Sequence, residues 1–214
     1  MVKGVIFDLD GVICSTDEFH YKAWKRICDE RSIPFDRKVN NLLRGVSRKD
    51  SLEIILKEAG MNFSDEEKDR MLKEKNDIYV SELSSLSSDD IAPGFMDFLS
   101  LLKKKGIKTA VGSSSKNTKR ILTHLGLINS FDAIADGTEI TRSKPDPEVF
   151  LLAAQKIHTD PKDCAVIEDA EAGIKAAKAG GMLGIAIKDA KKSPLADIRA
   201  DSFKEIASDL GLID

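Results

Sequence analysis

Cysteine is scarce in this sequence. Only three cysteines occur, Cys14, Cys28 and Cys164, and they are far apart. An odd number of cysteines at such spacing argues against a disulfide framework and against a cysteine-based zinc site. We therefore expect a protein of a reducing compartment and predict a cytoplasmic location.

Long apolar runs are also missing. The first residues lead directly into Asp8 and Asp10, which leaves no apolar region long enough for a signal peptide. No later stretch reaches the roughly 20 apolar residues that a membrane-spanning helix requires. The sequence therefore predicts no membrane partner.

Neither sign of charge dominates. The chain carries 33 basic and 36 acidic residues, a net charge of -3. Its lysines and arginines are scattered among acids instead of forming a basic patch with aromatic side chains, so we expect no nucleic-acid partner. A hydrophobic share of 42% over 214 residues is typical of a globular protein with one substantial domain, with or without an insertion.

Short apolar runs that end in polar turns recur along the chain. The first, Val5-Ile6-Phe7, precedes Asp8-Leu9-Asp10-Gly11. Further runs lie at 107–111, 131–134, 164–167 and 182–187, and segments with helical periodicity lie at 94–105, 117–125, 147–157 and 170–179. This alternation predicts an α/β fold, a Rossmann-like core with a parallel sheet and helices on both faces. Ligands of such sheets bind beyond the carboxyl ends of the strands.

Residues 16–87 follow a different pattern. Apolar side chains recur there at helical spacing, as at Phe19, Ala23 and Ile27, and no convincing strand is present. We predict a helical cap domain over 16–87, inserted into a catalytic core formed by 1–15 and 88–214. We expect the cap to move as a lid on hinges near Ser15 and Ser87.

Two carboxylates at the end of the first strand are the first candidate site residues. Asp8 and Asp10 are two positions apart, so both point to the same side of a strand, and Gly11 allows a tight turn beside them. Two like charges held together are costly unless a cation joins them. Taken alone, this motif is more often a solvated turn.

The ends of three later segments carry side chains suited to phosphate and metal binding. Ser113, with the backbone N–H groups of the next two serines, can hold a phosphate. Lys144 precedes a helix and can neutralise a phosphoryl oxygen. Glu168 and Asp169 offer the oxygen ligands that Mg²⁺ prefers. Each of these residues also has an ordinary explanation when it is taken alone. Ser113 could belong to a loop, Lys144 could lie on the surface, and the acidic pair could cap a helix.

The ordered set of Asp, Ser, Lys and an acidic pair at successive strand ends resembles the haloacid-dehalogenase superfamily over essentially the whole chain. The resemblance implies that Asp8 attacks phosphorus, Asp10 acts as general acid and base, and Ser113 and Lys144 hold the transferring phosphoryl group. It also implies one Mg²⁺ per chain, held by Asp8, the Asp10 carbonyl, Glu168 and Asp169.

Four blocks, at 8–24, 45–52, 75–79 and 113–117, are similar to the β-phosphoglucomutase family within that superfamily. By this resemblance, Arg48 grips the phosphate that is not transferred, and His20 links closure of the cap to the position of Asp10. Arg44 is a departure, since the family often has Lys there. The remaining substrate contacts that the resemblance implies are Leu9, Thr16, Trp24, Gly45, Val46, Lys75, Asn76, Ser114, Ser115, Lys116 and Asn117.

The function that this resemblance implies is the interconversion of β-D-glucose 1-phosphate and glucose 6-phosphate. The reaction passes through an aspartyl phosphate and β-glucose 1,6-bisphosphate, which is both intermediate and activator. We expect a monomer whose partners are small sugar phosphates. Two alternatives stay open: a sugar-phosphate phosphatase of the same superfamily, and a non-catalytic sugar-phosphate binding module.

Overall fold

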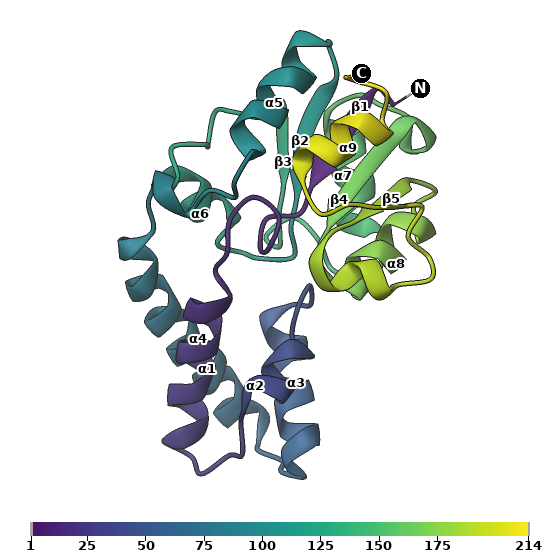
Figure 1. The fold of residues 1–214 in the computed structure, drawn as a ribbon. Helices are drawn as coiled ribbons and strands as arrows, with labels where there is room; N and C mark the ends of the chain where they lie inside the picture. The colour runs from purple at the N-terminus through teal and green to yellow at the C-terminus, as the bar shows by residue number, and fades with distance from the viewer. Residues whose placement is uncertain (1, 214) are drawn as a thin grey trace.

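The computed structural model describes residues 2–213. Figure 1 shows an α/β core with a separate group of helices beside it. The core sheet is parallel, and its strand order is β3-β2-β1-β4-β5-β6. The strands are β1 (Gly4–Phe7), β2 (Lys108–Gly112), β3 (Ala133–Ala135), β4 (Cys164–Glu168), β5 (Leu183–Ala186) and β6 (Ile198–Arg199). The predicted fold class is confirmed.

Both faces of the sheet are buried, as expected for parallel strands covered by helices. Val5 and Phe7 of β1 face one hydrophobic cluster, and Ile6 faces the other. The first cluster includes side chains from α5 (Phe95–Lys104), α6 (Thr118–His124) and α9 (Phe203–Asp209). The second includes side chains from α7 (Glu148–Lys156) and α8 (Glu171–Ala179). Because β1 lies between β2 and β4, the residues that follow β1 emerge near the middle of the carboxyl edge of the sheet.

The sequence pattern located the core helices within one or two residues, but it missed β6 and α9. β6 is only two residues long, which is too short for an apolar pattern. The strand expected at 131–134 begins later, at Ala133. Asp132 explains the shift, because its carboxylate accepts hydrogen bonds from the backbone N–H (2.8 Å) and the hydroxyl (3.2 Å) of Thr109.

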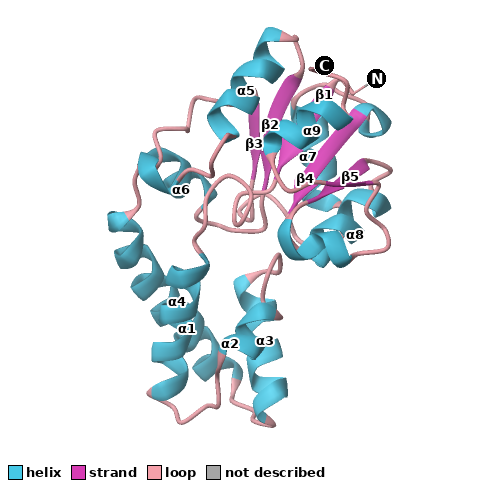
Figure 2. Cartoon of the chain, in the orientation of Figure 1, coloured by secondary structure: helices cyan, strands magenta, loops and turns pink. Residues whose placement is uncertain are grey.

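The cap consists of four α-helices, and no strand lies among them, as Figure 2 shows. They are α1 (Asp17–Asp29), α2 (Arg37–Asn41), α3 (Arg48–Ala59) and α4 (Asp65–Glu82). They share a hydrophobic cluster of their own, with Trp24, Ile27, Leu52 and Met71 among its buried members. The cap helices therefore have their own source of stability, and the exact domain division at 16 and 87 stays a prediction.

The two chain segments that join cap and core run side by side. Ala92 donates a backbone hydrogen bond to the Ile13 carbonyl (2.8 Å), and Cys14 forms an isolated antiparallel bridge with Ile91.

Short 3-10 helices occupy Leu83–Ser85, Ser88–Asp90, Pro161–Asp163 and Lys188–Lys192. Across residues 2–213, the helices lack the combination of length and apolar character that crossing a bilayer demands.

Candidate active site

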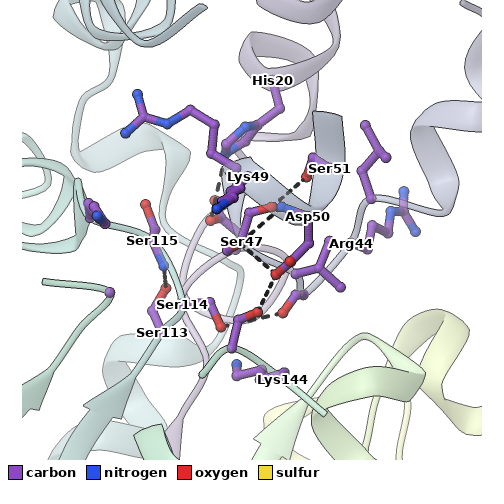
Figure 3. Close-up of a pocket in the computed structure, with 18 of the residues that line it drawn as sticks. His20, Arg44, Ser47, Lys49, Asp50, Ser51, Ser113, Ser114, Ser115 and Lys144 are labelled. Carbon is purple, nitrogen blue, oxygen red and sulfur yellow. Dashed lines mark hydrogen bonds and ion pairs between the residues drawn. The ribbon is translucent and has the colours of Figure 1, made fainter. Parts of the chain in front are cut away.

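A cavity of about 820 Å³ lies between the carboxyl edge of the sheet and the cap. The core contributes Asp8, Ser113 and Lys144 to its walls, and the cap contributes Trp24 and Arg48. Figure 3 shows side chains from both parts pointing into this space. A ligand bound there contacts both parts of the chain at once.

The turn after β1 places Asp8 and Asp10 at the floor of the cavity. Asp8 is 5% exposed, and its backbone N–H donates to the Ile167 carbonyl of β4 (3.0 Å). Gly11 has φ +82°, and a Cβ at this position would overlap the carboxylate of Asp169. Glycine is therefore required both for the backbone conformation and for the close approach of Asp169.

Lys144 is the cation of this floor, and its ammonium group is buried. Its Nζ donates to Oδ1 of Asp8 (2.5 Å) and to Oε1 of Glu168 (2.6 Å). Burial alone would lower the pKa of Lys144, but the two carboxylates outweigh this effect and raise the pKa above its ordinary value. Lys144 thus stays charged and offsets part of the negative charge of the cluster.

Three buried carboxylates offer a site for a divalent cation. Asp8, Glu168 and Asp169 each present an oxygen within 4.8 Å of the other two. Burial, followed by the negative charges of Glu168 and Asp8, raises the pKa of Asp169. Three carboxylates exceed the single charge of Lys144, and all three offer oxygen. The donor set therefore fits Mg²⁺, which prefers oxygen ligands.

Asp10 is suited to exchange a proton near neutral pH. Burial raises the pKa of Asp10 to about 7, and the charge of Asp8 acts in the same direction. A hydrogen bond from the Thr16 hydroxyl opposes this rise. A carboxyl group with a pKa near 7 can serve as either acid or base.

His20 and Lys75 connect the cap to Asp10. Nζ of Lys75 lies 2.7 Å from Nδ1 of His20, and Nε2 of the same ring lies 3.9 Å from Oδ2 of Asp10. Burial and the charge of Lys75 lower the pKa of His20 well below its ordinary value. Burial and the charge of Arg48 lower the pKa of Lys75 to about 7. A neutral His20 that accepts from Lys75 therefore carries its proton on the nitrogen that faces Asp10.

The segment after β2 is held as a polar loop on the core side. Ser113 donates its backbone N–H to the Ala135 carbonyl (3.1 Å), and its hydroxyl accepts from the backbone N–H of Ser115 (3.2 Å). The Ser115 hydroxyl in turn accepts from the backbone N–H of Asn117 (3.2 Å). This ordered run of serine hydroxyls beside Lys116 is a suitable surface for phosphate oxygens.

Arg48 is one of the cations that the cap contributes to this cavity. It occupies the first residue of α3, and one terminal nitrogen of its guanidinium donates to the Leu72 carbonyl (3.1 Å). Within residues 2–213, Arg48 takes part in none of the ion pairs that the structure contains. Its guanidinium is therefore available for an anion in the cavity.

Most of the predicted site residues line this one cavity. The core supplies Asp8, Asp10, Ser113, Ser114, Ser115, Lys116, Asn117, Lys144 and Asp169, and the cap supplies His20, Trp24, Gly45, Val46, Arg48, Lys75 and Asn76. Leu9, Thr16 and Glu168 lie behind its walls and are fully buried. Leu9 and Thr16 therefore do not line the cavity. The Thr16 hydroxyl donates to Asp10, and Glu168 accepts from Lys144. The roles assigned to all these residues stay predictions.

The sequence patterns missed several cavity residues, among them Arg44, Asp50 and Ser143. Arg44 forms ion pairs with Asp17 of the cap and Asp189 of the core, each at 2.7 Å. Ser143 precedes Lys144, and Asp50 lies two residues after Arg48, so proximity to a predicted site residue was the one available signal. The contacts of Arg44 with Asp189 and of Ser143 with Asp50 form only when the chain folds, because these partners are far apart in the sequence.

Comparisons with known proteins agree with this geometry. The sequence model of haloacid dehalogenase-like hydrolases matches residues 2–181. The β-phosphoglucomutase of Bacillus subtilis (strain 168) is 42% identical over 211 residues, which cover 98% of this chain and 93% of that protein. The fructose-1-phosphate phosphatase YqaB of Escherichia coli (strain K12) is 30% identical over 189 residues, which cover 86% of this chain and 96% of the relative.

A solved structure shows the same arrangement of the chain. The crystal structure of a β-phosphoglucomutase from Clostridium difficile matches with a TM-score of 0.91 at 39% identity. The match covers 96% of this chain and 93% of that one. The resemblance that the sequence blocks indicated is thereby confirmed.

Replacement of one carboxylate tests the proposed cation site. Asp169→Asn removes one buried like charge, so without metal we expect the free energy of unfolding to rise by about 1 kcal/mol or more. The parent should gain roughly 2–3 kcal/mol from Mg²⁺ at a hundredfold excess over its dissociation constant, whereas the variant should gain little. Urea unfolding in EDTA and in Mg²⁺ measures both effects. Asp209→Asn, at the exposed end of α9, is the control and should respond like the parent. Equal stabilisation of Asp169→Asn and the parent by Mg²⁺ would contradict the assignment.

Proposed function

The chain belongs to the haloacid dehalogenase-like hydrolase family, and from this premise we propose that it interconverts β-D-glucose 1-phosphate and glucose 6-phosphate. The observation that carries the proposal is a cavity lined both by core and by cap residues that are suited to phosphate binding, Ser113 and Lys144 on the core and Arg48 on the cap. The identity of 42% to the Bacillus subtilis β-phosphoglucomutase supports the same reaction.

The proposed mechanism uses Asp8 as a covalent nucleophile. An Asp8 phosphoenzyme transfers its phosphoryl group to the C6 hydroxyl of β-glucose 1-phosphate, which gives β-glucose 1,6-bisphosphate. After the bisphosphate turns around, Asp8 attacks the phosphorus on C1 and glucose 6-phosphate leaves. The two transfers balance, so the phosphoenzyme is regenerated and the bisphosphate acts as intermediate and activator.

Charge is the main obstacle, because a carboxylate must approach a phosphate dianion. Lys144, 2.5 Å from Asp8, supports the approach by holding the nucleophile and by offsetting the charge of the phosphoryl oxygens. When bound, Mg²⁺ supplies further neutralisation at Asp8, Glu168, Asp169 and the Asp10 carbonyl. Ser113 donates its hydroxyl to the same phosphoryl group.

Asp10 moves the proton in both transfers. As a base it takes the proton of the C6 hydroxyl when that oxygen attacks the phosphoenzyme. As an acid it returns a proton to the C1 oxygen when glucose 6-phosphate leaves. A pKa of about 7 allows both states. His20, whose Nε2 lies 3.9 Å from Oδ2 of Asp10, is proposed to link the cap to this carboxyl group.

The cap binds the rest of the substrate. Arg48, with Ser115, Lys116 and Asn117 of the core, is proposed to hold the phosphate that is not transferred. Trp24, Gly45, Val46, Lys75 and Asn76 are proposed to surround the sugar, and Ser114 to add a contact near Asp8. Leu9 and Thr16, which are fully buried behind the cavity wall, are proposed to support Asp8 and Asp10 from behind. Planar guanidinium suits the phosphate geometry, so Arg48 can favour a substrate that spans both walls.

A sugar-phosphate phosphatase is the second candidate, favoured by the 30% identity to the fructose-1-phosphate phosphatase of Escherichia coli. In that case water discharges the phosphoenzyme. A non-catalytic binding module is the weaker alternative, because Asp8, Asp10, Lys144 and Asp169 are all present and gathered in one cavity.

We also propose that the protein acts as a cytoplasmic monomer with a cap domain at 16–87. Side chains of a single chain line both walls of the cavity, so catalysis needs no second subunit. Cys14, Cys28 and Cys164 are buried and form no disulfide, which fits a reducing compartment.

Substitution of the two aspartates separates nucleophile from proton carrier. Asp8→Asn should lower mutase turnover by at least about 10³-fold, because an amide is a poor nucleophile. Asp10→Asn should lower it by roughly 10²–10⁴-fold while still accepting a phosphoryl group from acetyl phosphate, whose leaving acetate needs no proton. Mass spectrometry of the protein after acetyl phosphate treatment detects the phosphoenzyme. A phosphorylated Asp8→Asn protein would remove Asp8 from the mechanism.

Arg48→Ala tests the second phosphate site. The variant loses a charge-assisted contact worth about 1.5–3 kcal/mol, or roughly ten- to more than a hundredfold in rate. The loss should fall on glucose 6-phosphate formation, whereas hydrolysis of acetyl phosphate, which has no second phosphate, should be nearly unchanged. Both rates are measured at fixed Mg²⁺, with Arg70→Ala on the exposed surface of α4 as the control. Equal slowing of both reactions would exclude a distal phosphate role for Arg48.

A further inference from the structure

Several polar contacts hold the cap against the core across the cavity. Arg44 pairs with Asp189 (2.7 Å), Asn117 donates its side-chain amide to Asn76 (3.0 Å), and the Ser143 hydroxyl donates to Asp50 (2.5 Å). The last contact differs from the other two in its position. It joins the residue directly before Lys144 to a residue two positions after Arg48.

The Asp50 carboxylate is fixed by its own helix. Ser47 is the N-cap of α3, and its hydroxyl accepts from the backbone N–H of Asp50 (3.2 Å). The same hydroxyl donates to Oδ2 of Asp50 (2.6 Å), and this oxygen also accepts from Ser143. Figure 3 shows these hydrogen bonds converging on Asp50 between cap and core. Asp50 therefore moves with the helix turn that carries Arg48.

The backbone around Ser143 is held by hydrogen bonds within the core. The Ser143 carbonyl accepts from the backbone N–H of Asp146 (3.0 Å), and Glu148 accepts from the backbone N–H groups of Thr141 (3.1 Å) and Arg142 (2.7 Å). Lys144 follows directly and reaches Asp8. The loop is thus held on both sides of Ser143, so its hydroxyl reports the position of the loop that carries Lys144.

We propose that Asp50 and Ser143 are positioning residues whose hydrogen bond sets the separation between the two phosphate-binding walls. With the bond formed, the helix turn that carries Arg48 and the loop that carries Lys144 are held together, which favours a substrate with two phosphate groups at opposite ends of a hexose. The bond also keeps the cap closed over the phosphoenzyme and excludes water. This inference rests on the proposed mutase function and specifies how its two phosphate sites are kept in register.

Loss of the bond should change the fate of the phosphoenzyme. A hydrogen bond to a carboxylate corresponds to about tenfold or more in an equilibrium. Because Asp50 is exposed, we expect a smaller effect, roughly three- to tenfold. Ser143→Ala should lower kcat/KM for glucose 6-phosphate formation by this factor. It should also raise the ratio of released inorganic phosphate to glucose 6-phosphate by a similar factor, a change that a stability defect alone does not produce.

The experiment is a double-mutant cycle of Ser143→Ala and Asp50→Ala, measured with β-glucose 1-phosphate and catalytic β-glucose 1,6-bisphosphate. If the two residues act through one bond, the double variant is no slower than Asp50→Ala alone. Ser143→Thr keeps the hydroxyl and should stay near the parent. Ser64→Ala removes the N-cap of α4, distant from the cavity, and should lower the stability but leave the product ratio unchanged.

Two outcomes overturn the inference while leaving the proposed function intact. In the first, the parent makes glucose 6-phosphate, and the losses of kcat/KM in Ser143→Ala and Asp50→Ala add up in the double variant. The second is a product ratio in Ser143→Ala that equals that of the parent. A parent that makes no glucose 6-phosphate would instead reject the proposed function, and with it this specification.

Discussion

The crowding of carboxylates at the carboxyl ends of β1 and β4 is the constraint on which the rest of the site depends. Asp8, Glu168 and Asp169 lie together in a buried place, where like charges are costly without cations. Lys144 offsets part of this charge through two short ion pairs. Position 11 is a glycine, since the Cβ of any other residue would overlap the carboxylate of Asp169. Stability is thus given up locally to keep the proposed nucleophile, Asp8, beside the proposed cation site.

The cap contributes positively charged side chains to the same cavity. Arg48 and Lys75 enter the cavity from the cap helices, and Lys75 is buried beside the rings of Trp24 and Tyr79 at 5.3 Å and 4.4 Å from its Nζ. Burial of Lys75, together with the charge of Arg48, lowers the pKa of Lys75 to about 7. Under the proposed function, the phosphates of the substrate would meet Lys144 on the core wall and Arg48 on the cap wall. Substrate binding would then favour the closed arrangement of the cap.

Sequence reasoning worked where chemistry is tied to a strand end. Asp8, Ser113 and Glu168 each follow or end an apolar run, so the parallel sheet alone places them on one edge. Leu9 and Thr16 came from a matching block, and a linear pattern does not distinguish a side chain in a cavity wall from one behind it. Asp50 and Ser143 were missed because their contact spans 93 positions of sequence and neither residue carries a pattern of its own. The short strand β6 was missed for lack of length.

The ratio of the two products separates a mutase from a phosphatase. A mutase requires an Asp8 phosphoenzyme enclosed by the cap, so that a sugar hydroxyl and not water accepts the phosphoryl group. The measurement is the amount of glucose 6-phosphate and of inorganic phosphate formed from β-glucose 1-phosphate with Mg²⁺ and catalytic β-glucose 1,6-bisphosphate. The account predicts that glucose 6-phosphate forms in large excess. Inorganic phosphate formed faster than glucose 6-phosphate would contradict it and would identify a phosphatase.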